Sequence, residues 1–365
     1  MSETLARIAT PHFHTLTIAE RRQETADAIS LRFAVPRELA EEFRFEPGQY
    51  LTLRAVVDGE DLRRSYSICS APDHGELRVA IKRVEGGVFS NWANDELHEG
   101  DTLEVMTPTG RFGLLGVTGN GSLHVGFAAG SGITPIMSIV QGVLAREPES
   151  RFVLFYGSRS VDGILFRETL EDLKDQHLGR LTVFHVLSRE EQDIAVLNGH
   201  LDDEKIRRTL NTMVPVADID HAFICGPEGM IETLSATLAD LGLDAAKIHT
   251  ERFVSVLGGK PRAAKAVDTN APPAAIATII VDGNRRDVPV AAGEAILDAA
   301  LRAGLELPFA CKGGMCCSCR AKLTEGAAEM ELNYSLEPWE VAQGFILTCQ
   351  GKPTTAKVEV DFDAV

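Results

Sequence analysis

The sequence predicts a multidomain protein with an antiparallel β-barrel, then an α/β domain built on a parallel sheet, then a smaller C-terminal domain. Its 365 residues exceed one ordinary hydrophobic core and suit several domains. The spacing of apolar residues changes along the chain, and a Pro/Gly-bearing stretch without periodicity precedes the last segment. We place the domains at residues 1–115, 116–253 and 275–365, with a linker at 254–274.

The first two segments differ in their apolar period. Residues 50–56, 77–81 and 102–105 alternate apolar and polar side chains between Pro/Gly-rich turns, which favours an antiparallel barrel. The second segment alternates apolar strands with helical stretches, which predicts βαβ units and ligands at the carboxyl ends of the strands. The expected strands are 123–129, 152–156, 181–187 and 221–225, and the expected helices are 135–145, 165–176, 201–210 and 227–241.

The third segment opens with an expected strand at 276–281, a turn at 282–284 and a short strand at 288–290. A helix is expected over 295–303, followed by a loop rich in cysteine.

Composition excludes some classes of function. Apolar residues make up 44% and charged residues 24%, as in a folded soluble protein, and the longest apolar run, 274–281, is too short to span a bilayer. Residues 1–16 lack the features of a secretory signal, so we expect a cytoplasmic protein with no membrane contact. The net charge of −17 and the lack of a Lys/Arg block argue against nucleic acid. The acidity favours solubility, or alternatively steers docking to a basic patch on a partner protein.

Four cysteines have the spacing of an iron–sulfur site. Cys311, Cys316 and Cys319 follow the pattern C-x4-C-x2-C, and Cys349 stands downstream. This is the plant-type [2Fe–2S] spacing, and thiolates are the soft ligands that such clusters need. Glycines in the loop allow backbone N–H groups to point at sulfur.

A structural zinc site is the alternative, since four thiolates also bind zinc. Zinc ribbons usually present two separate C-x2-C pairs, whereas here three ligands share one loop, so we favour iron and sulfide. Cys317 lies between two ligands, and we predict that it is not one. From about residue 275 onward the chain resembles plant-type ferredoxin modules, which implies an α+β, β-grasp-like fold.

The barrel segment carries a candidate flavin site. Arg64-Ser65-Tyr66-Ser67 precedes Lys82 and the run Gly86-Gly87-Val88-Phe89-Ser90. Arginine binds phosphate in a bidentate manner, tyrosine offers a face for ring stacking, and Gly and Ser leave amides and a hydroxyl for a pyrophosphate. Taken singly, Arg64 fits a surface ion pair, Tyr66 a core aromatic, and the Gly pair a hairpin turn.

Together these residues resemble the ferredoxin-NADP reductase family. The resemblance implies that Arg64 holds the flavin phosphate, that Tyr66 packs on the isoalloxazine, and that Ser67 lies near the reactive flavin nitrogen. It also implies FAD rather than FMN, because a pyrophosphate cradle is expected. That cradle consists of Gly87, Val88, Phe89 and Ser90, and Ser65, Ile81 and Lys82 complete the expected flavin site.

Two loops of the second segment resemble the family's nicotinamide motifs. Gly130, Gly132, Thr134 and Pro135 match G-x-G-x-T-P, with Thr134 expected as the N-cap of a helix whose free N–H groups face a phosphate. Cys225-Gly226-Pro227, followed by Met230, resembles the motif whose Cys lies beside the nicotinamide. On its own Cys225 would be a small buried hydrophobe.

Two further predictions complete the site. Glu251 joins Ser67 and Cys225 as expected catalytic residues, and Phe253 is expected to cover the flavin face until nicotinamide displaces it. Ser158 and Arg159 follow the second strand, where an acidic residue would repel a 2′-phosphate, so NADPH is expected rather than NADH.

The order of domains resembles the reductase components of bacterial multicomponent oxygenases, in particular those of the phenylacetyl-CoA epoxidase type. This implies electron transfer from NAD(P)H through FAD and a [2Fe–2S] cluster to the iron centre of an oxygenase. Reductases of ketosteroid hydroxylases or ring-hydroxylating oxygenases, and a general reductase without a dedicated oxygenase, are alternatives. A non-catalytic redox-sensing or scaffold protein is the alternative outside enzymes.

Overall fold

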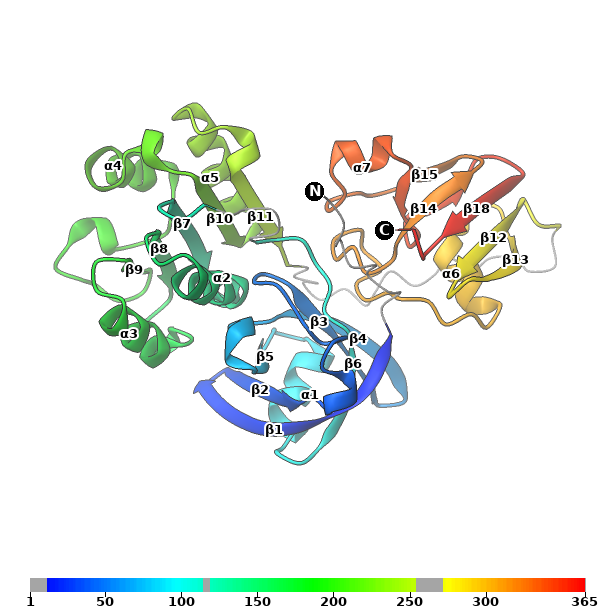
Figure 1. Cartoon of the computed structure of the whole chain (residues 1–365), viewed down its shortest axis with the longest axis horizontal. Helices are drawn as coiled ribbons and strands as arrows, with labels where there is room; N and C mark the ends of the chain where they lie inside the picture. Colours follow the sequence, from blue (N-terminus) through cyan, green and yellow to red (C-terminus); the bar gives the residue numbers. More distant parts are fainter. Residues whose placement is uncertain (1–11, 114–118, 254–271, 365) are drawn as a thin grey trace.

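A computed structural model describes residues 12–113, 119–253 and 272–364 in three domains (Figure 1). The barrel is drawn in blue and cyan, the α/β domain in green, and the C-terminal domain in yellow to red. The predicted boundary at 115/116 and most of the predicted linker fall outside the described residues, so those positions stay predictions.

The first domain is a six-stranded antiparallel sheet in the order β4-β3-β6-β1-β2-β5. An isolated bridge between Ile68 and Val79 joins the segment after β4 to β5, the strand at the opposite edge, so the sheet curls into a barrel as predicted. A helix that was not predicted from the sequence, α1 (Val88–Glu96), packs Phe89 and Ala93 into the barrel core. The strands are β1 (Phe13–Thr25), β2 (Ala28–Ala34), β3 (Tyr50–Val57), β4 (Glu60–Ser67), β5 (Leu77–Lys82) and β6 (Thr102–Met106).

The second domain has a five-stranded parallel sheet in the order β11-β10-β7-β8-β9, which confirms the βαβ prediction. Helices α2 (Ile133–Arg146) and α3 (Arg167–Gln176) pack on one face, and α4 (Asp203–Met213) and α5 (Glu228–Asp240) on the other. The strand order reverses between β7 and β10, and ligands collect at such a switch point. The strands are β7 (Leu123–Ala129), β8 (Arg151–Ser158), β9 (Leu181–Leu187), β10 (His221–Gly226) and β11 (Ile248–Arg252).

The third domain has a mixed sheet in the order β13-β12-β18-β14-β16, with β12 parallel to β18 and the other pairs antiparallel. Helix α6 (Ile296–Arg302) packs on this sheet, as the β-grasp-like expectation requires. A two-stranded ribbon and the short helix α7 (Pro338–Ala342) were not predicted. The strands are β12 (Ala275–Val281), β13 (Asn284–Val290), β14 (Arg320–Glu325), β15 (Ala328–Met330), β16 (Phe345–Leu347), β17 (Gly351–Pro353) and β18 (Lys357–Asp361).

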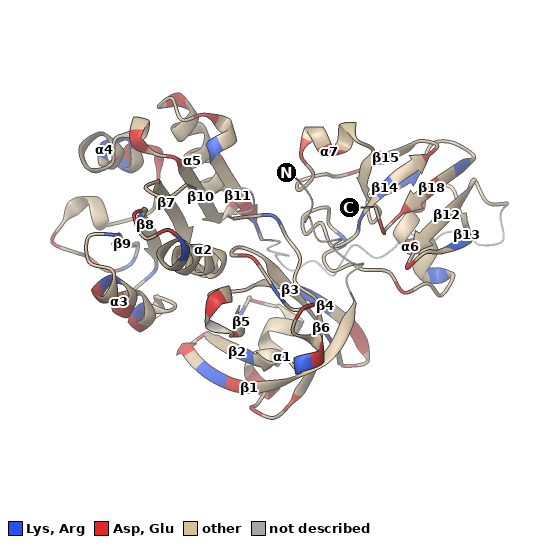
Figure 2. Ribbon diagram, in the orientation of Figure 1, with Lys and Arg blue, Asp and Glu red and all other residues tan. Residues whose placement is uncertain are grey.

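Charged residues of both signs are intermixed on all three domains (Figure 2). Among the described residues, no helix has the length and apolar character needed to cross a bilayer.

The segment that leaves the barrel toward the α/β domain packs tightly against the start of β3. A Cβ at Gly48 would lie 1.6 Å from the carbonyl oxygen of Phe112, and one at Gly113 would lie 2.1 Å from that of Pro47. Both glycines have positive φ, +94° and +138°. Only glycine satisfies both the backbone conformation and the close approach.

Replacing Gly48 tests how much this packing contributes to stability. Gly59, in the β3–β4 turn, also has a positive φ, but a Cβ added there would have nothing within 4 Å, so Gly59→Ala is the matched control. Gly59→Ala should cost about 1 kcal/mol from backbone strain, and Gly48→Ala about 3 kcal/mol because the Phe112 carbonyl must also move. Apparent melting temperatures from circular dichroism would measure both. Equal losses would contradict the packing argument.

Candidate functional site

The β3–β4 hairpin presents the candidate flavin residues. Tyr66 is partly buried and packs against Phe89, with ring centroids 5.9 Å apart. The guanidinium of Arg64 donates to the Arg63 carbonyl at 2.7 Å and has no carboxylate partner within the described part of the chain. Its donors are therefore available for a phosphate. Ser65 faces Thr52 across the hairpin, with hydroxyl oxygens 3.3 Å apart.

The N-terminus of α1 forms the other half of this site. The N-cap is Gly87, where a Cβ would lie 2.7 Å from the Ser90 hydroxyl, and that hydroxyl accepts a hydrogen bond from the Val84 N–H at 3.1 Å. The loop is thereby held against the helix, whose first-turn N–H groups suit an anion. Gly87 permits this packing, and the N–H groups at the start of α1 are those that a pyrophosphate would contact.

The other predicted flavin residues differ in which of their atoms are accessible to a flavin. Ile81 and Phe89 have their side chains in the barrel core, which leaves only backbone atoms for a ligand. Val88 is about half exposed, and Lys82 pairs with Asp27 at 3.4 Å. Their roles in binding FAD stay predictions.

The first nicotinamide loop corrects one expectation. Thr134 is not the N-cap of α2, because the helix begins at Ile133 with Gly132 as its N-cap. The preceding 3-10 turn, η3 (Gly130–Gly132), already winds in the helical sense, and Gly132 has helical angles of φ −61° and ψ −10°. Thr134 is instead buried in the first turn, and its hydroxyl donates to the Ser131 carbonyl at 2.9 Å. Pro135 therefore occupies the third helical position.

The two nicotinamide loops touch one another at their glycines. A Cβ at Gly132 would lie 2.1 Å from the Cys225 carbonyl oxygen. One at Gly226 would lie 2.5 Å from Met230 Cε and 3.2 Å from Ala129 Cβ. Pro227 is the N-cap of α5, so this loop also leads from a strand end into a helix. The glycines therefore allow the loops at the carboxyl ends of β7 and β10 to pack directly against one another, where a larger residue would collide.

The three predicted catalytic residues lie together where the barrel meets the α/β domain. The Ser67 hydroxyl donates to Glu251 Oε2 at 3.4 Å, and Glu251 is paired with Cys225 in the β10–β11 register. Burial raises the pKa of Glu251 to about 8, although the hydrogen bond from Ser67 acts in the opposite direction. Burial also raises the pKa of the Cys225 thiol. At neutral pH both groups are mainly protonated. Phe253 packs against the neighbouring core, partly buried.

The carboxyl ends of β8 and β9 bring two Ser-Arg pairs side by side. The Ser188 N–H donates to the Ser158 carbonyl at 3.0 Å, and the Arg189 N–H to the Arg159 carbonyl at 2.8 Å. Both arginines are exposed, whereas Ser158 is buried. The first pair was predicted from the sequence, and the second was missed. The signal was available, because Ser188-Arg189 directly follows β9 and Ser158-Arg159 stands at the end of β8, each after an apolar strand.

The four predicted cluster ligands form two close thiol pairs, Cys311 with Cys316 and Cys319 with Cys349. A hydrogen bond with Cys316 lowers the pKa of Cys311 to about 5, and the Gly313 N–H, 3.2 Å from Cys311 Sγ, acts in the same direction. A hydrogen bond with Cys319 lowers the pKa of Cys349, and in each pair the hydrogen bond and burial raise the pKa of the other thiol, Cys316 or Cys319. Within the described residues no three His, Cys, Asp or Glu side chains converge on one ion position. The two pairs together supply the four thiol ligands that a plant-type [2Fe–2S] cluster requires.

Cys317 adopts a positive φ of +54°, and its Sγ lies 3.6 Å from the Ser335 carbonyl, to which it donates. The Cys317 thiol therefore donates to the backbone of the 331–337 segment and belongs to neither of the two thiol pairs.

The cluster loop also contacts the barrel. The hydroxyl of Tyr50 donates to the Cys316 carbonyl and lies 3.0 Å from the Ser318 hydroxyl oxygen. Tyr50 is paired with Ser67 in the β3–β4 register. The predicted cluster ligand Cys316 and the predicted flavin residue Ser67 are therefore both neighbours of one residue, the first through its side chain and the second through strand pairing.

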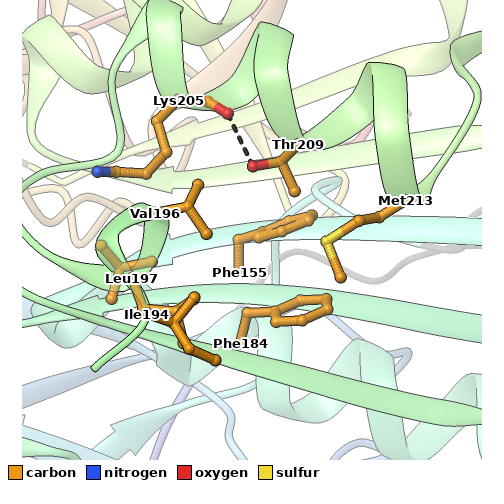
Figure 3. A pocket seen from close by; sticks show the side chains of 9 residues that line it. Phe155, Phe184, Ile194, Val196, Leu197, Lys205, Thr209 and Met213 are labelled. Carbon is orange, nitrogen blue, oxygen red and sulfur yellow. Dashed lines mark hydrogen bonds between the residues drawn. The ribbon is translucent and has the colours of Figure 1, made fainter. Parts of the chain in front are cut away.

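A small apolar pocket of about 130 Å³ lies elsewhere in the α/β domain, between β8, β9 and α4 (Figure 3). The rings of Phe155 and Phe184 stack in it with centroids 5.1 Å apart, and Thr209 donates to the Lys205 carbonyl at 2.7 Å. None of the predicted site residues lines this pocket.

Comparisons with known proteins agree with this arrangement. Residues 15–113 match the oxidoreductase FAD-binding domain family, residues 127–236 the oxidoreductase NAD-binding domain family, and residues 279–354 the 2Fe-2S iron-sulfur cluster binding domain family. The chain is 44% identical to one subunit of the 1,2-phenylacetyl-CoA epoxidase of Escherichia coli (strain K12), over 96% of this chain and 98% of that one. The chain belongs to the family of reductase components of oxygenases.

A second relative of this reductase is the ferredoxin reductase component of 3-ketosteroid-9-alpha-monooxygenase from Rhodococcus rhodochrous, 33% identical over 95% of this chain and 96% of that one. Among solved structures, phthalate dioxygenase reductase matches with a TM-score of 0.58 at 23% identity, covering 96% of this chain and 98% of that chain. At that identity the likeness concerns the fold alone. The reductase is a flavin and iron–sulfur oxidoreductase with FAD-binding, NAD-binding and 2Fe–2S domains.

The assignment of cluster ligands can be tested with adjacent cysteines. We expect Cys317→Ser to keep the visible absorption, the EPR signal and the iron content of the cluster, because its thiol donates to the Ser335 carbonyl and belongs to neither thiol pair. Cys316→Ser, the matched control one residue away, should lose them. Loss of the cluster in Cys317→Ser would show that the ligand set is wrong.

The raised pKa of Glu251 predicts how stability depends on pH. The folded carboxyl keeps its proton up to about pH 8, whereas the unfolded one releases it near 4.5, so this group stabilises the fold at low pH and loses that contribution as pH rises between these values. Between these pH values, the free energy of unfolding of the wild type should fall, relative to that of Glu251→Gln, by up to about 1.4 kcal/mol per pH unit. Thermal unfolding of both proteins at several pH values up to 8 would measure this. Glu85→Gln, which removes an exposed carboxyl, is the control. Parallel curves for the wild type and Glu251→Gln would contradict the burial argument.

Proposed function

We propose that this reductase passes electrons from NADPH to the oxygenase component of a phenylacetyl-CoA epoxidase. The observation that carries the proposal is the 44% identity over 98% of the relative from Escherichia coli, which is named as a subunit of that epoxidase. The relative named for 3-ketosteroid-9-alpha-monooxygenase is 33% identical. The arrangement of Ser67, Glu251 and Cys225 beside the two nicotinamide loops supports the arrival of electrons at this point of the fold.

When bound, FAD converts the two-electron hydride of the nicotinamide into single electrons, which a [2Fe–2S] cluster delivers one at a time. Arg64 and the N-terminus of α1 would bind the flavin phosphates, and Tyr66 would pack on the flavin ring. Gly132 and Gly226 allow the two nicotinamide loops to meet beside Cys225, where the nicotinamide nucleotide would bind. Ser67 and the protonated Glu251 hold a proton at the domain boundary. The four paired thiols hold the cluster.

The preference for NADPH is attributed to the two Ser-Arg pairs at the ends of β8 and β9. The two exposed guanidinium groups of Arg159 and Arg189 offer donors to a 2′-phosphate, and neither strand is followed directly by a carboxylate. In nucleotide-binding sheets an acidic residue at the strand end binds the ribose 2′-OH and repels that phosphate.

The proposed acceptor is an oxygenase with an iron centre, and reconstitution tests it. The reductase is mixed anaerobically with NADPH and then with purified phenylacetyl-CoA epoxidase oxygenase or ketosteroid oxygenase, each with its substrate and oxygen. Product formation with the phenylacetyl-CoA system supports the proposal. Product formation only with the ketosteroid system would contradict it and identify the ketosteroid oxygenase as the acceptor. Failure to reduce cytochrome c or ferricyanide with NADPH despite bound cofactors favours the non-catalytic alternative.

Substituting the arginines tests the nucleotide preference. Arg159→Ala and Arg189→Ala should each raise the KM for NADPH by about tenfold, since a charged hydrogen bond is worth about 1.5 kcal/mol or more, and should leave that for NADH unchanged. Steady-state reduction of ferricyanide measures both. Arg167→Ala, on the exposed surface of α3, is the control. An equal effect on both nucleotides would contradict recognition of the 2′-phosphate.

A further inference from the structure

We propose that Tyr50 is the positioning residue for electron transfer from the flavin to the cluster, because its hydroxyl fixes the cluster loop against the strand pair that carries the flavin residues. The inference rests on the proposed electron path but concerns a separate step within it. Tyr50 belongs to none of the predicted cofactor motifs.

The barrel fixes Tyr50 from three directions. Its backbone exchanges hydrogen bonds with Thr109 at 2.8 and 3.0 Å, and its strand partner on the other side is Ser67. Gly110 lies against its ring, where a Cβ would come within 2.9 Å of Cδ1. The side chain is 6% exposed. A buried tyrosine with so little space around it has one orientation, and its hydroxyl points out of the barrel into the third domain.

The Tyr50 hydroxyl contacts the loop of the third domain that carries the predicted cluster ligands. It donates to the carbonyl of Cys316, a predicted iron ligand, and lies 3.0 Å from the hydroxyl of Ser318, one residue before the ligand Cys319. Both contacts are therefore made inside the short loop that carries three of the four ligands. The flavin-side residue Ser67 and the ligand Cys316 are neighbours of the same tyrosine.

Two flanking contacts bring the domains together, but neither touches the ligand loop itself. The guanidinium of Arg111 pairs with Glu340, which is 1% exposed and also accepts from Arg320 at 2.9 Å. The guanidinium of Arg63 lies 3.9 Å from the ring centroid of Phe309. These contacts dock the third domain, whereas Tyr50 sets the position of the loop within the docked arrangement.

The expected consequence concerns one step only. Each hydride from NADPH delivers two electrons and one proton, the electrons leave the flavin singly through the cluster to a one-electron acceptor such as cytochrome c, and the protons are released to solvent. Loss of the Tyr50 hydroxyl leaves hydride transfer untouched, because that step occurs on the side of Cys225 and Glu251. Loss of this hydroxyl makes the cluster loop more mobile, so the transfer of single electrons from the flavin to the cluster slows.

The test is single-turnover kinetics of Tyr50→Phe with all cofactors bound. Stopped-flow absorption follows flavin reduction by NADPH, and freeze-quench EPR follows cluster reduction. We expect flavin reduction at the wild-type rate and cluster reduction slower by about tenfold, the effect of losing one hydrogen bond of ordinary strength. A second readout does not depend on turnover: hydrogen exchange at the amides of 316–318 in the oxidised protein should accelerate.

Tyr334→Phe is the matched control. Tyr334 lies beside the same loop, where its N–H donates to the Gly314 carbonyl at 3.0 Å, but its side chain is 47% exposed, and the change should alter neither rate. If Tyr50→Phe does not fold, Ser318→Ala is the alternative test, because it removes the contact between the Tyr50 and Ser318 hydroxyls. Cluster reduction at the wild-type rate in Ser318→Ala would then overturn the proposal. Unchanged cluster reduction and unchanged exchange in a folded Tyr50→Phe would overturn it equally. Loss of flavin reduction in the wild type would instead overturn the proposed function.

Discussion

The close approach of residues 47–50 to residues 109–113 is the constraint on which the rest of the structure depends. Gly48 and Gly113 allow the two segments to pack backbone against backbone. Consecutive residues of the second segment then serve different domains: Gly110 supports Tyr50 within the barrel, Arg111 pairs with Glu340 of the third domain, and Phe112 packs edge-on against Phe223 of the α/β domain. One short stretch of chain therefore sets the relative positions of all three cofactor-binding domains.

Burial and hydrogen bonding shift the pKa values of acidic groups at both ends of the electron path. At the barrel–α/β boundary, burial raises the pKa values of Glu251 and Cys225 and keeps both protonated. In the cluster loop, hydrogen bonds lower the pKa of one thiol in each pair, Cys311 or Cys349, whereas the same pairing and burial raise the pKa of its partner, Cys316 or Cys319. Neutral groups suit a site that receives a hydride, and thiolates suit a site that binds iron.

Features that depend on local sequence could be predicted, and those that depend on long-range packing could not. The parallel sheet followed from the spacing of apolar strands and helices, and the cluster loop from the cysteine spacing. Helix α1 was missed because the Gly86-Gly87 pair before it resembles a turn, and Thr134 was wrongly made an N-cap because the preceding turn already winds as a helix. The contact between Tyr50 and Cys316 joins residues far apart in the chain, and no local pattern indicates it.

The most direct test of this electron path is an anaerobic titration of the oxidised reductase with NADPH, followed by visible absorption and EPR. We predict that flavin absorption is lost and that a [2Fe–2S] EPR signal develops in the same protein, with each NADPH supplying two electrons. A protein whose flavin is reduced while no such signal develops, or one that holds zinc at the four thiols, would contradict it.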